Sequence, residues 1–76
     1  MDPSQRSDDE LANCLTDREL EVLRLMAEGC DNQAIADRLR LDRATIRTHV
    51  EAVLAKLDVP SRLLAVARAV RLGLCG

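Results

Sequence analysis

One predicted helix, residues 43–57, carries the side chains of this sequence that are best suited to recognising another molecule. Its apolar residues recur at three-to-four spacing, which is typical of a helix packed on a core: Ile46, Val50, Val53 and Leu57, with Leu54 at the edge. The opposite face holds Ala44, Arg47, Thr48, Glu51 and Ala55. Arginine can donate two hydrogen bonds to guanine O6 and N7, a threonine methyl can contact thymine, and a carboxylate can accept from cytosine N4. The alternative is that this face is only a solvated helix surface, on which Glu51 repels phosphates.

The remaining polar residues show no pattern that is typical of a metal centre or an active site. Cys14, Cys30 and Cys75 have no CxxC spacing, and His49 is the only histidine, so we expect no zinc site. We expect three reduced thiols, with the histidine used in packing or, alternatively, in a phosphate contact. No nucleophile stands in a recognisable arrangement with a base, and there is no glycine-rich phosphate loop. The sequence therefore predicts neither an enzyme nor a cofactor.

The composition limits the class of protein. The chain has 76 residues, no Phe, Tyr or Trp, and a formal net charge of −2. This length allows one domain, and the lack of aromatic rings excludes proteins that stack single-stranded bases on them. No apolar run approaches the ~20 residues of a membrane span. Without a membrane span or an export signal, we expect a cytoplasmic protein.

The charge is unevenly distributed along the chain. Residues 1–37 hold three basic and ten acidic side chains, whereas residues 38–76 hold eight basic and three acidic ones. The basic excess falls on the helix 43–57 and on the last helix, where a polyanion would be met. The overall negative charge therefore does not exclude DNA as a partner.

The sequence predicts an N-terminal tail and four helices, and no segment alternates as a strand does. Residues 1–14 are polar and acidic without periodicity, which predicts a disordered tail. The first helix begins after Thr16, which can form a capping box with Glu19, and stops at Gly29. Its expected apolar stripe comprises Leu20, Val22, Leu23, Met26 and Ala27.

The second and third helices have the lengths and the connection of a helix-turn-helix. Asp31 caps a short helix over residues 32–39, and Asp42 caps the helix 43–57 after a tight turn. Small Ala36 suits the crossing of the two helices, with Ile46 as its partner in the core. The inward residues of the short helix are Ile35, Ala36 and Leu39. In such motifs the second helix enters the major groove and reads bases with its N-terminal residues.

The last helix, capped by Ser61 and stopped at Gly73, has two apolar faces. The core stripe comprises Ala65, Val66, Ala69 and Leu72, and the second stripe comprises Leu63, Ala67, Val70 and Leu74. Leu64, Arg68 and Arg71 are left for water. Because a small domain cannot bury both stripes, the second one predicts a two-fold homodimer. The alternative is a closing helix that is fully buried.

Four groups of residues follow one another at fixed spacing along residues 15–74. They are Leu15-Thr16-x-x-Glu19-x-Glu21-Val22-Leu23, Gly29-x-x-Asn32-x-x-Ile35-Ala36, Leu41-x-x-x-Thr45-Ile46-Arg47-x-His49 and Lys56-Leu57-x-Val59-x-x-Arg62-x-x-Ala65-Val66. This pattern resembles the LuxR/GerE-type DNA-binding domain. The resemblance implies an all-α, four-helix bundle-like fold with a helix-turn-helix, found in bacterial transcription regulators. The chain then resembles either a stand-alone GerE-like regulator or an excised response-regulator output domain.

The resemblance also implies roles for individual residues. It places base contacts at Arg47, Thr48 and Glu51. It places phosphate contacts at Asn32, Gln33, Thr45 and Lys56. Arg43, at the start of the helix 43–57, is a further candidate for a phosphate contact. It agrees with dimerisation through Leu63, Ala67, Val70 and Leu74, so that residues 15–76 form one DNA-binding and dimerisation domain.

Three residues depart from the family pattern. Asp42 replaces the usual serine cap, which keeps the cap and adds a negative charge near phosphates. Asp58 stands where glycine is common and must adopt or avoid a left-handed conformation. Glu51 stands where several members have a basic or neutral residue, which bears on affinity and sequence preference and leaves the fold unchanged.

The leading hypothesis is a regulator that binds double-stranded DNA specifically as a homodimer, with RNA polymerase or another regulator as a further candidate partner. The alternative is a small adaptor of the same fold that binds another regulator, through its last helix or acidic tail, and little or no DNA. In the tail, Asp8, Asp9 and Glu10 either shield the basic face or are inert.

Overall fold

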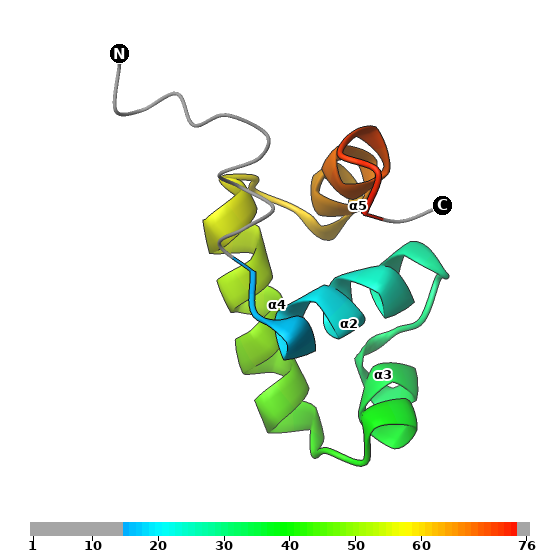
Figure 1. Ribbon diagram of the computed structural model, residues 1–76. Helices are drawn as coiled ribbons and strands as arrows, with labels where there is room; N and C mark the ends of the chain where they lie inside the picture. Colours follow the sequence, from blue (N-terminus) through cyan, green and yellow to red (C-terminus); the bar gives the residue numbers. More distant parts are fainter. Residues whose placement is uncertain (1–14, 75–76) are drawn as a thin grey trace.

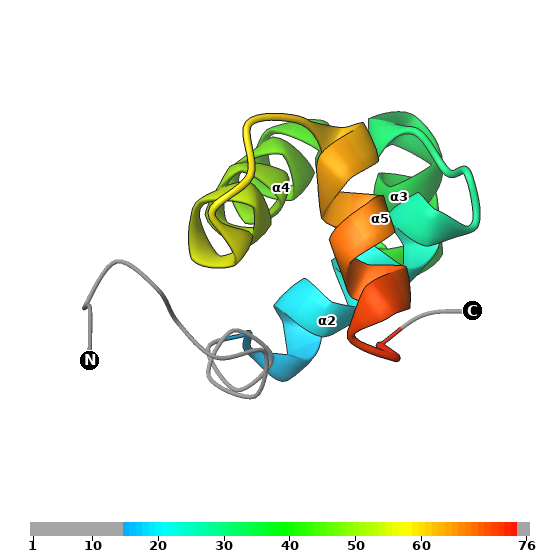
Figure 2. The same cartoon turned by 90° about the horizontal axis from the view of Figure 1, so that it is seen from above.

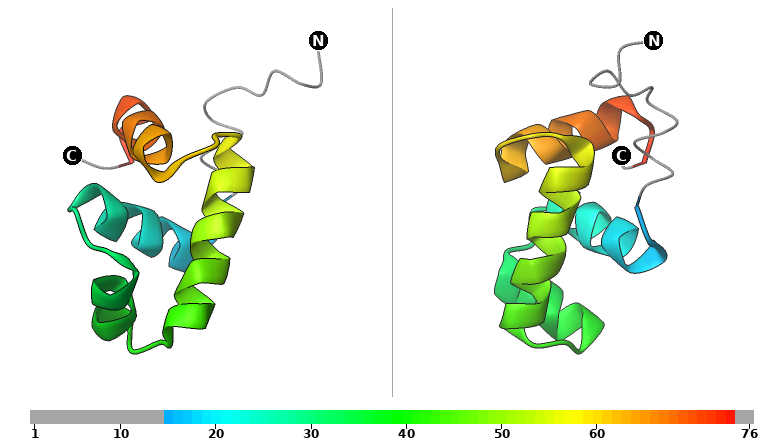
Figure 3. Two further views of the ribbon diagram at one scale, coloured as in Figure 1. Left: turned by 180° about the vertical axis from the view of Figure 1, so that it is seen from behind. Right: turned by 90° about the vertical axis from the view of Figure 1, so that its left-hand side faces the viewer.

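The computed structural model describes residues 15–74, and within this range the chain forms four helices and no strand. They are α2 (Asp17–Ala27), α3 (Asn32–Leu39), α4 (Arg43–Leu57) and α5 (Arg62–Arg71). Figure 1 shows α4 along one side of the molecule, with α3 at its N-terminal end, α5 at its C-terminal end and α2 between them. The same arrangement is visible from behind and from the side (Figure 3). The predicted tail, residues 1–14, lies outside the described residues.

Each helix begins at the capping residue that the sequence predicts. The Thr16 hydroxyl accepts from the Glu19 backbone N–H at 3.1 Å, and the Glu19 carboxylate accepts from the Thr16 N–H at 2.9 Å, so the capping box is confirmed. Asp31, Asp42 and Ser61 cap α3, α4 and α5 in the same way, each accepting from the N–H three residues later. These bonds satisfy backbone donors that a helix start leaves unpaired.

All four helices also end in the same way. A residue with positive φ follows each helix: Gly29, Arg40, Asp58 and Gly73. The N–H of the next residue then donates to the carbonyl five positions back, at 2.9 to 3.1 Å: Cys30 to Leu25, Leu41 to Ala36, Val59 to Leu54 and Leu74 to Ala69. This is the hydrogen bond of a Schellman ending. It turns the apolar residue after the helix back onto the core, where Cys30, Leu41, Val59 and Leu74 are half-buried.

The core lies between α2, α4 and α5, and α3 closes it from the side of the turn. Its buried residues are Val22, Leu23, Leu25, Met26, Ile35, Ala36, Ile46, Val50, Val53, Leu57, Ala65 and Ala69. The stripe predicted for α4 is confirmed. In α2 the prediction is partly wrong, because Leu25 is buried whereas Leu20 and Ala27 are only half-buried. Helix α2 contacts α3, α4 and α5, so its buried surface is wider than one stripe.

Helix α5 does not bury both of its apolar faces. Ala65 and Ala69 are buried, but Leu63 is 78% exposed and Val70 is 54% exposed. The alternative of a fully buried closing helix is therefore wrong for the single chain. Seen from above, one side of α5 faces α2 and α4 (Figure 2).

Two expectations about this end of the chain are corrected. Leu74 does not continue the exposed stripe, because the turn at Gly73 returns it to the core. Arg68 is not left for water: its Nη1 donates to the Leu57 carbonyl oxygen at 3.0 Å and so ties the end of α4 to α5. No helix in residues 15–74 has the length and hydropathy to span a membrane.

Candidate nucleic-acid interface

Helices α3 and α4 pack as the predicted helix-turn-helix. Ala36 and Ile46 are both buried, and the Leu41 N–H donates to the Ala36 carbonyl oxygen at 3.0 Å across the turn. The small side chain at position 36 leaves room for α4 to pack closely. The apolar stripe of α4 faces this core, so its polar face is turned to solvent.

The three predicted base-contacting residues all lie exposed on that polar face. Arg47 Nε donates to Glu51 Oε1 at 3.4 Å, and the two side chains are 78% and 66% exposed. Such an exposed pair, one helical turn apart, contributes only ~0.3–0.5 kcal/mol. A guanine can therefore replace the carboxylate as the partner of the guanidinium at little cost.

Thr48 makes a different contact with its own helix. Its hydroxyl donates to the Ala44 carbonyl oxygen at 3.1 Å. This bond occupies the hydroxyl hydrogen and leaves the methyl group as the apolar surface that the exposed side chain offers. The geometry thus suits the methyl contact with thymine that the sequence suggests.

The start of α4 combines a negative cap with cationic and hydroxyl side chains. Hydrogen bonds from the Thr45 side chain and backbone hold the pKa of Asp42 below its usual value. These bonds favour the ionised carboxylate, which accepts from the N–H of Thr45 at 2.7 Å and is thus bound to its own helix. Arg43, beside the cap, is exposed and forms no ion pair within residues 15–74.

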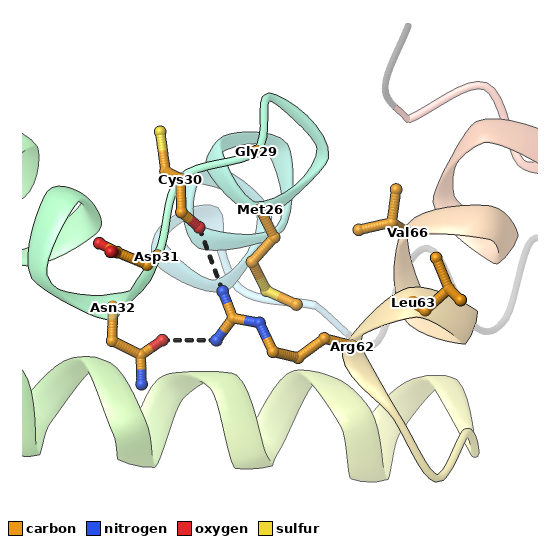
Figure 4. A pocket seen from close by; sticks show the side chains of 8 residues that line it. All are labelled: Met26, Gly29, Cys30, Asp31, Asn32, Arg62, Leu63 and Val66. Atoms are coloured by element: carbon orange, nitrogen blue, oxygen red, sulfur yellow. Dashed lines mark hydrogen bonds between the residues drawn. The ribbon is translucent and has the colours of Figure 1, made fainter.

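At the start of α3, the two amide side chains have partners within the protein. Gln33 Nε2 donates to Asp37 Oδ1 at 2.9 Å, one turn along the same helix. Asn32 Oδ1 accepts from Arg62 Nη1, and the second guanidinium nitrogen, Nη2, donates to the Cys30 carbonyl oxygen at 3.1 Å (Figure 4). No local sequence signal indicates this role of Arg62, because its partners lie about thirty residues away along the chain.

Lys56 lies at the far end of α4 and pairs with the capping box of α2. Its Nζ donates to Glu19 Oε1 at 2.6 Å, and the side chains are 34% and 8% exposed. Burial alone raises the pKa of Glu19, but the hydrogen bond from Lys56 and those from Thr16 outweigh it and hold the pKa below its usual value. The expected phosphate-binding lysine thus has a structural partner, and no local sequence signal relates two residues 37 positions apart.

The structure places five of the eight residues predicted to contact DNA in one part of the molecule. Arg43, Thr45, Arg47, Thr48 and Glu51 occupy the first turns of α4, whereas Lys56 lies at its other end and Asn32 and Gln33 begin α3. His49 is half-buried on α4. The exposed stripe, which we define as Leu63, Ala67 and Val70, lies on α5.

Outside this surface, few of the described residues are candidates for redox chemistry or metal binding. Cys30 is a half-buried free thiol, and Cys14 and Cys75 lie outside the described residues. No three His, Cys, Asp or Glu residues between positions 15 and 74 are grouped so that they could hold a metal ion.

Comparison with known proteins finds similarity to bacterial regulatory proteins. The family GerE, described as "Bacterial regulatory proteins, luxR family", matches residues 13–69. The chain is 44% identical over 63 residues to the uncharacterized response regulatory protein YgeK of Escherichia coli, covering 83% of this chain and 43% of YgeK. It is 46% identical over 57 residues to the response regulator protein VraR of Staphylococcus aureus, covering 75% of this chain and 27% of VraR. The chain thus spans less than half the length of these curated relatives.

A solved structure agrees with this result. The structure of the transcription factor GerE matches with a TM-score of 0.76 at 30% sequence identity, covering 93% of this chain and 97% of that one. The family match extends over most of the chain, and the four helices match those of a solved member. The protein therefore belongs to the luxR family of bacterial regulatory proteins, as a DNA-binding helix-turn-helix domain.

Proposed function

We propose that the protein binds specific double-stranded DNA sites as a homodimer, with α4 in the major groove, and thereby regulates bacterial transcription. The observation that carries the proposal is the division of α4 into two faces. Its apolar stripe is buried in the core, and Arg47, Thr48 and Glu51 stand exposed on the other side. A helix held in this way can enter the major groove without breaking any contact of the core. The proposal places the protein in the cytoplasm, with the DNA.

Base recognition is assigned to the exposed face of α4. Arg47 donates to a guanine in place of its bond with Glu51, the Thr48 methyl contacts a thymine, and Glu51 accepts from a cytosine amino group. A freed carboxylate next to phosphates is repelled unless it finds such a donor. Glu51 therefore contributes to specificity more than to affinity.

Phosphate contacts are assigned to Asn32, Gln33, Arg43, Thr45 and Lys56. Such contacts fix the position of the protein on the duplex and carry no sequence information. Lys56 makes this contact in addition to its bond with Glu19, since an ammonium group has three donors and this one is partly exposed. Arg43 forms no ion pair within the described part of the chain, so no such bond has to break before it binds a phosphate.

Dimerisation is assigned to the exposed stripe of α5. Leu63 and Val70 are large apolar side chains that are 78% and 54% exposed in the single chain. A two-fold pair of α5 helices buries the same patch from both protomers. It would place two α4 helices at half-sites about one helical turn of DNA apart.

The test is selection of bound duplexes from a random pool by the purified protein at defined salt. We expect an approximately palindromic site. Arg47→Ala should then weaken binding to that site by ~1–3 kcal/mol and relax its sequence preference. Arg71→Ala, which removes an exposed arginine at the end of α5, is the matched control for charge. Equal losses on the selected duplex and on unrelated duplexes for Arg47→Ala would contradict the proposed role in base recognition.

The second candidate function is an adaptor that keeps this fold and binds another regulator. The exposed leucine at position 63 and the acidic pI of about 5.3 favour it. Binding to bulk duplex DNA separates the two functions. A DNA-binding protein that neutralises phosphates loses affinity steeply as salt rises, whereas an adaptor without phosphate contacts shows no such binding.

A further inference from the structure

Arg62 occupies a position in α5 that its own helix does not explain. It is the first residue of α5, directly after the Ser61 cap, and the first turn contains no acidic residue. The N-terminal end of a helix carries a partial positive charge, so a cation there is unfavourable. A contact outside the helix must therefore offset the unfavourable position of this cation.

That contact is a two-donor bridge to the other side of a groove. The groove, about 580 Å³ in volume, lies between the α2–α3 connection and the start of α5. Within it, the half-buried guanidinium donates to the Cys30 carbonyl oxygen and to Asn32 Oδ1 (Figure 4). The Asp31 carboxylate points away from it in this view and accepts from the N–H of Ala34 instead. Both acceptors are thus neutral.

The bridge fixes which way the Asn32 amide faces. A guanidinium has five donors and no acceptor, so it can bond only the oxygen of an amide. With Oδ1 held by Arg62, the Nδ2 amino group points away from the guanidinium (Figure 4). Nδ2 forms no hydrogen bond with residues 15–74, and because no side-chain nitrogen or oxygen there is both buried and unpaired, Nδ2 is reached by solvent. The two amide hydrogens are therefore open to an outside acceptor.

We propose that Arg62 is a positioning residue for DNA binding: it orients the Asn32 amide so that its amino group donates to a DNA phosphate. The inference depends on the proposed function, because it needs a duplex at the start of α3. It also links the helix assigned to dimerisation with a phosphate contact on α3. Arg62 itself does not touch the DNA in this arrangement.

The salt dependence of binding separates positioning from direct contact. A cation that neutralises a phosphate contributes about 0.9 to the slope of log affinity against log salt, whereas a neutral amide contributes none. We expect Arg62→Met to weaken binding to the selected duplex and to an unrelated duplex equally, by about fivefold, at an unchanged slope. Arg71→Met, which removes the same charge from the other end of α5, is the control. A slope lowered by about 0.9 for Arg62→Met alone would instead make Arg62 a phosphate contact and overturn the proposal.

A double-mutant cycle tests whether the two residues act together. In the Asn32→Ala background, Arg62→Met should cause no further loss of affinity beyond that of the control. Additive losses would mean independent roles and would contradict the proposal. Thermal unfolding of each variant shows whether it is folded at the temperature of the binding experiment.

Asn32→Asp decides the case if Arg62→Met fails to fold. The carboxylate keeps an acceptor for the guanidinium, so we expect stability at least equal to that of the unmodified chain. The substitution also removes both amide hydrogens and places a negative charge next to the phosphate. The affinity for DNA should therefore fall by more than in Asn32→Ala. Unchanged affinity in Asn32→Asp would overturn the inference. If the unmodified chain binds neither duplex at low salt, the proposed function itself is wrong.

Discussion

At the scale of single residues, Glu19 shows how one buried carboxylate serves two helices. It completes the capping box of α2 and accepts from Lys56 at the end of α4, and it is the one buried charged residue within the described range. The ion pair has its carboxylate in the interior and its ammonium partly in water. Arg62 and Arg68 act similarly, since each carries donors from α5 to oxygens of other segments.

This arrangement predicts the effect of Glu19→Gln. Glutamine can still accept from the Thr16 N–H, since either residue completes a capping box, so the substitution removes mainly the charge pair. We expect a loss of ~1.5 kcal/mol in the free energy of unfolding at neutral pH, the scale of a hydrogen bond to a charged group. Urea unfolding measures it. Glu21→Gln on the exposed side of the same helix is the control and should cost less than ~0.5 kcal/mol.

The same pair predicts how stability depends on pH. Because the pKa of Glu19 is lower in the folded protein than its usual value near 4.5, the folded state favours the ionised form. The resulting stabilisation is complete above that usual value and is lost as pH falls through the folded pKa. Unfolding measured stepwise from neutral to acidic pH should show a shallower acid-side decline for Glu19→Gln than for the unmodified chain. Parallel declines would mean that the pair does not contribute.

At the scale of secondary-structure elements, the four Schellman endings share one geometry but not one residue type. Gly29 and Gly73 adopt positive φ without a side-chain penalty, whereas Arg40 and Asp58 do so at φ 57° and 56°. A side chain in this region costs energy that glycine avoids. Of the two possibilities for Asp58, adopting or avoiding the left-handed conformation, the structure shows the first.

The cost at this position can be measured by Asp58→Gly. We expect the substitution to stabilise the protein by ~1 kcal/mol, because the gain from relieving the backbone exceeds the greater freedom of glycine in the unfolded chain. Asp58→Ala is the control, since it removes the carboxylate at a helix C-terminus but keeps a side chain at positive φ. An equal gain in both variants would assign the effect to charge, and chemical denaturation distinguishes the two cases.

At the scale of the whole molecule, the single chain leaves apolar surface exposed on one helix. A chain of this size buries only ~60% of its unfolded surface, so covering the exposed stripe of α5 would also add stability. The charge is separated along the same fold: the acidic excess falls in residues 1–37, and the basic excess in residues 38–76, which include α4 and α5. The proposed dimer interface and the proposed base contacts thus both lie in the second half of the chain, whereas the phosphate contacts proposed at the start of α3 lie in the first.

The oligomeric state tests the proposed interface. We expect the unmodified chain to sediment as a dimer at micromolar concentration, and Leu63→Glu with Val70→Glu to sediment as a folded monomer. Placing two like-charged carboxylates on a two-fold contact opposes association. Leu64→Glu is the control, because this leucine is exposed but lies off the stripe. A double variant that remains dimeric would exclude this face as the interface.

The local elements of this protein could be predicted from its sequence. Thr16, Asp31, Asp42 and Ser61 begin helices and Gly29 and Gly73 end two of them, as expected, because each of these bonds joins residues no more than five positions apart. The apolar stripe of α4 and the exposure of its polar face followed from helical periodicity. The site residues on this face could therefore be named before the fold was known, and their contacts with DNA stay predictions.

Contacts between helices were decided only by the tertiary structure. Lys56 meets Glu19, and Arg62 meets the Asn32 amide, across 37 and 30 positions of sequence. Leu74, placed by periodicity on the exposed stripe, instead packs on the core because Gly73 ends the helical repeat. Local hydrogen bonds depend on neighbouring residues alone, whereas these contacts depend on how the packed core orients α2, α3, α4 and α5. The sequence thus determined where the helices begin and end. The packing of the helices determined which polar side chains make contacts between them.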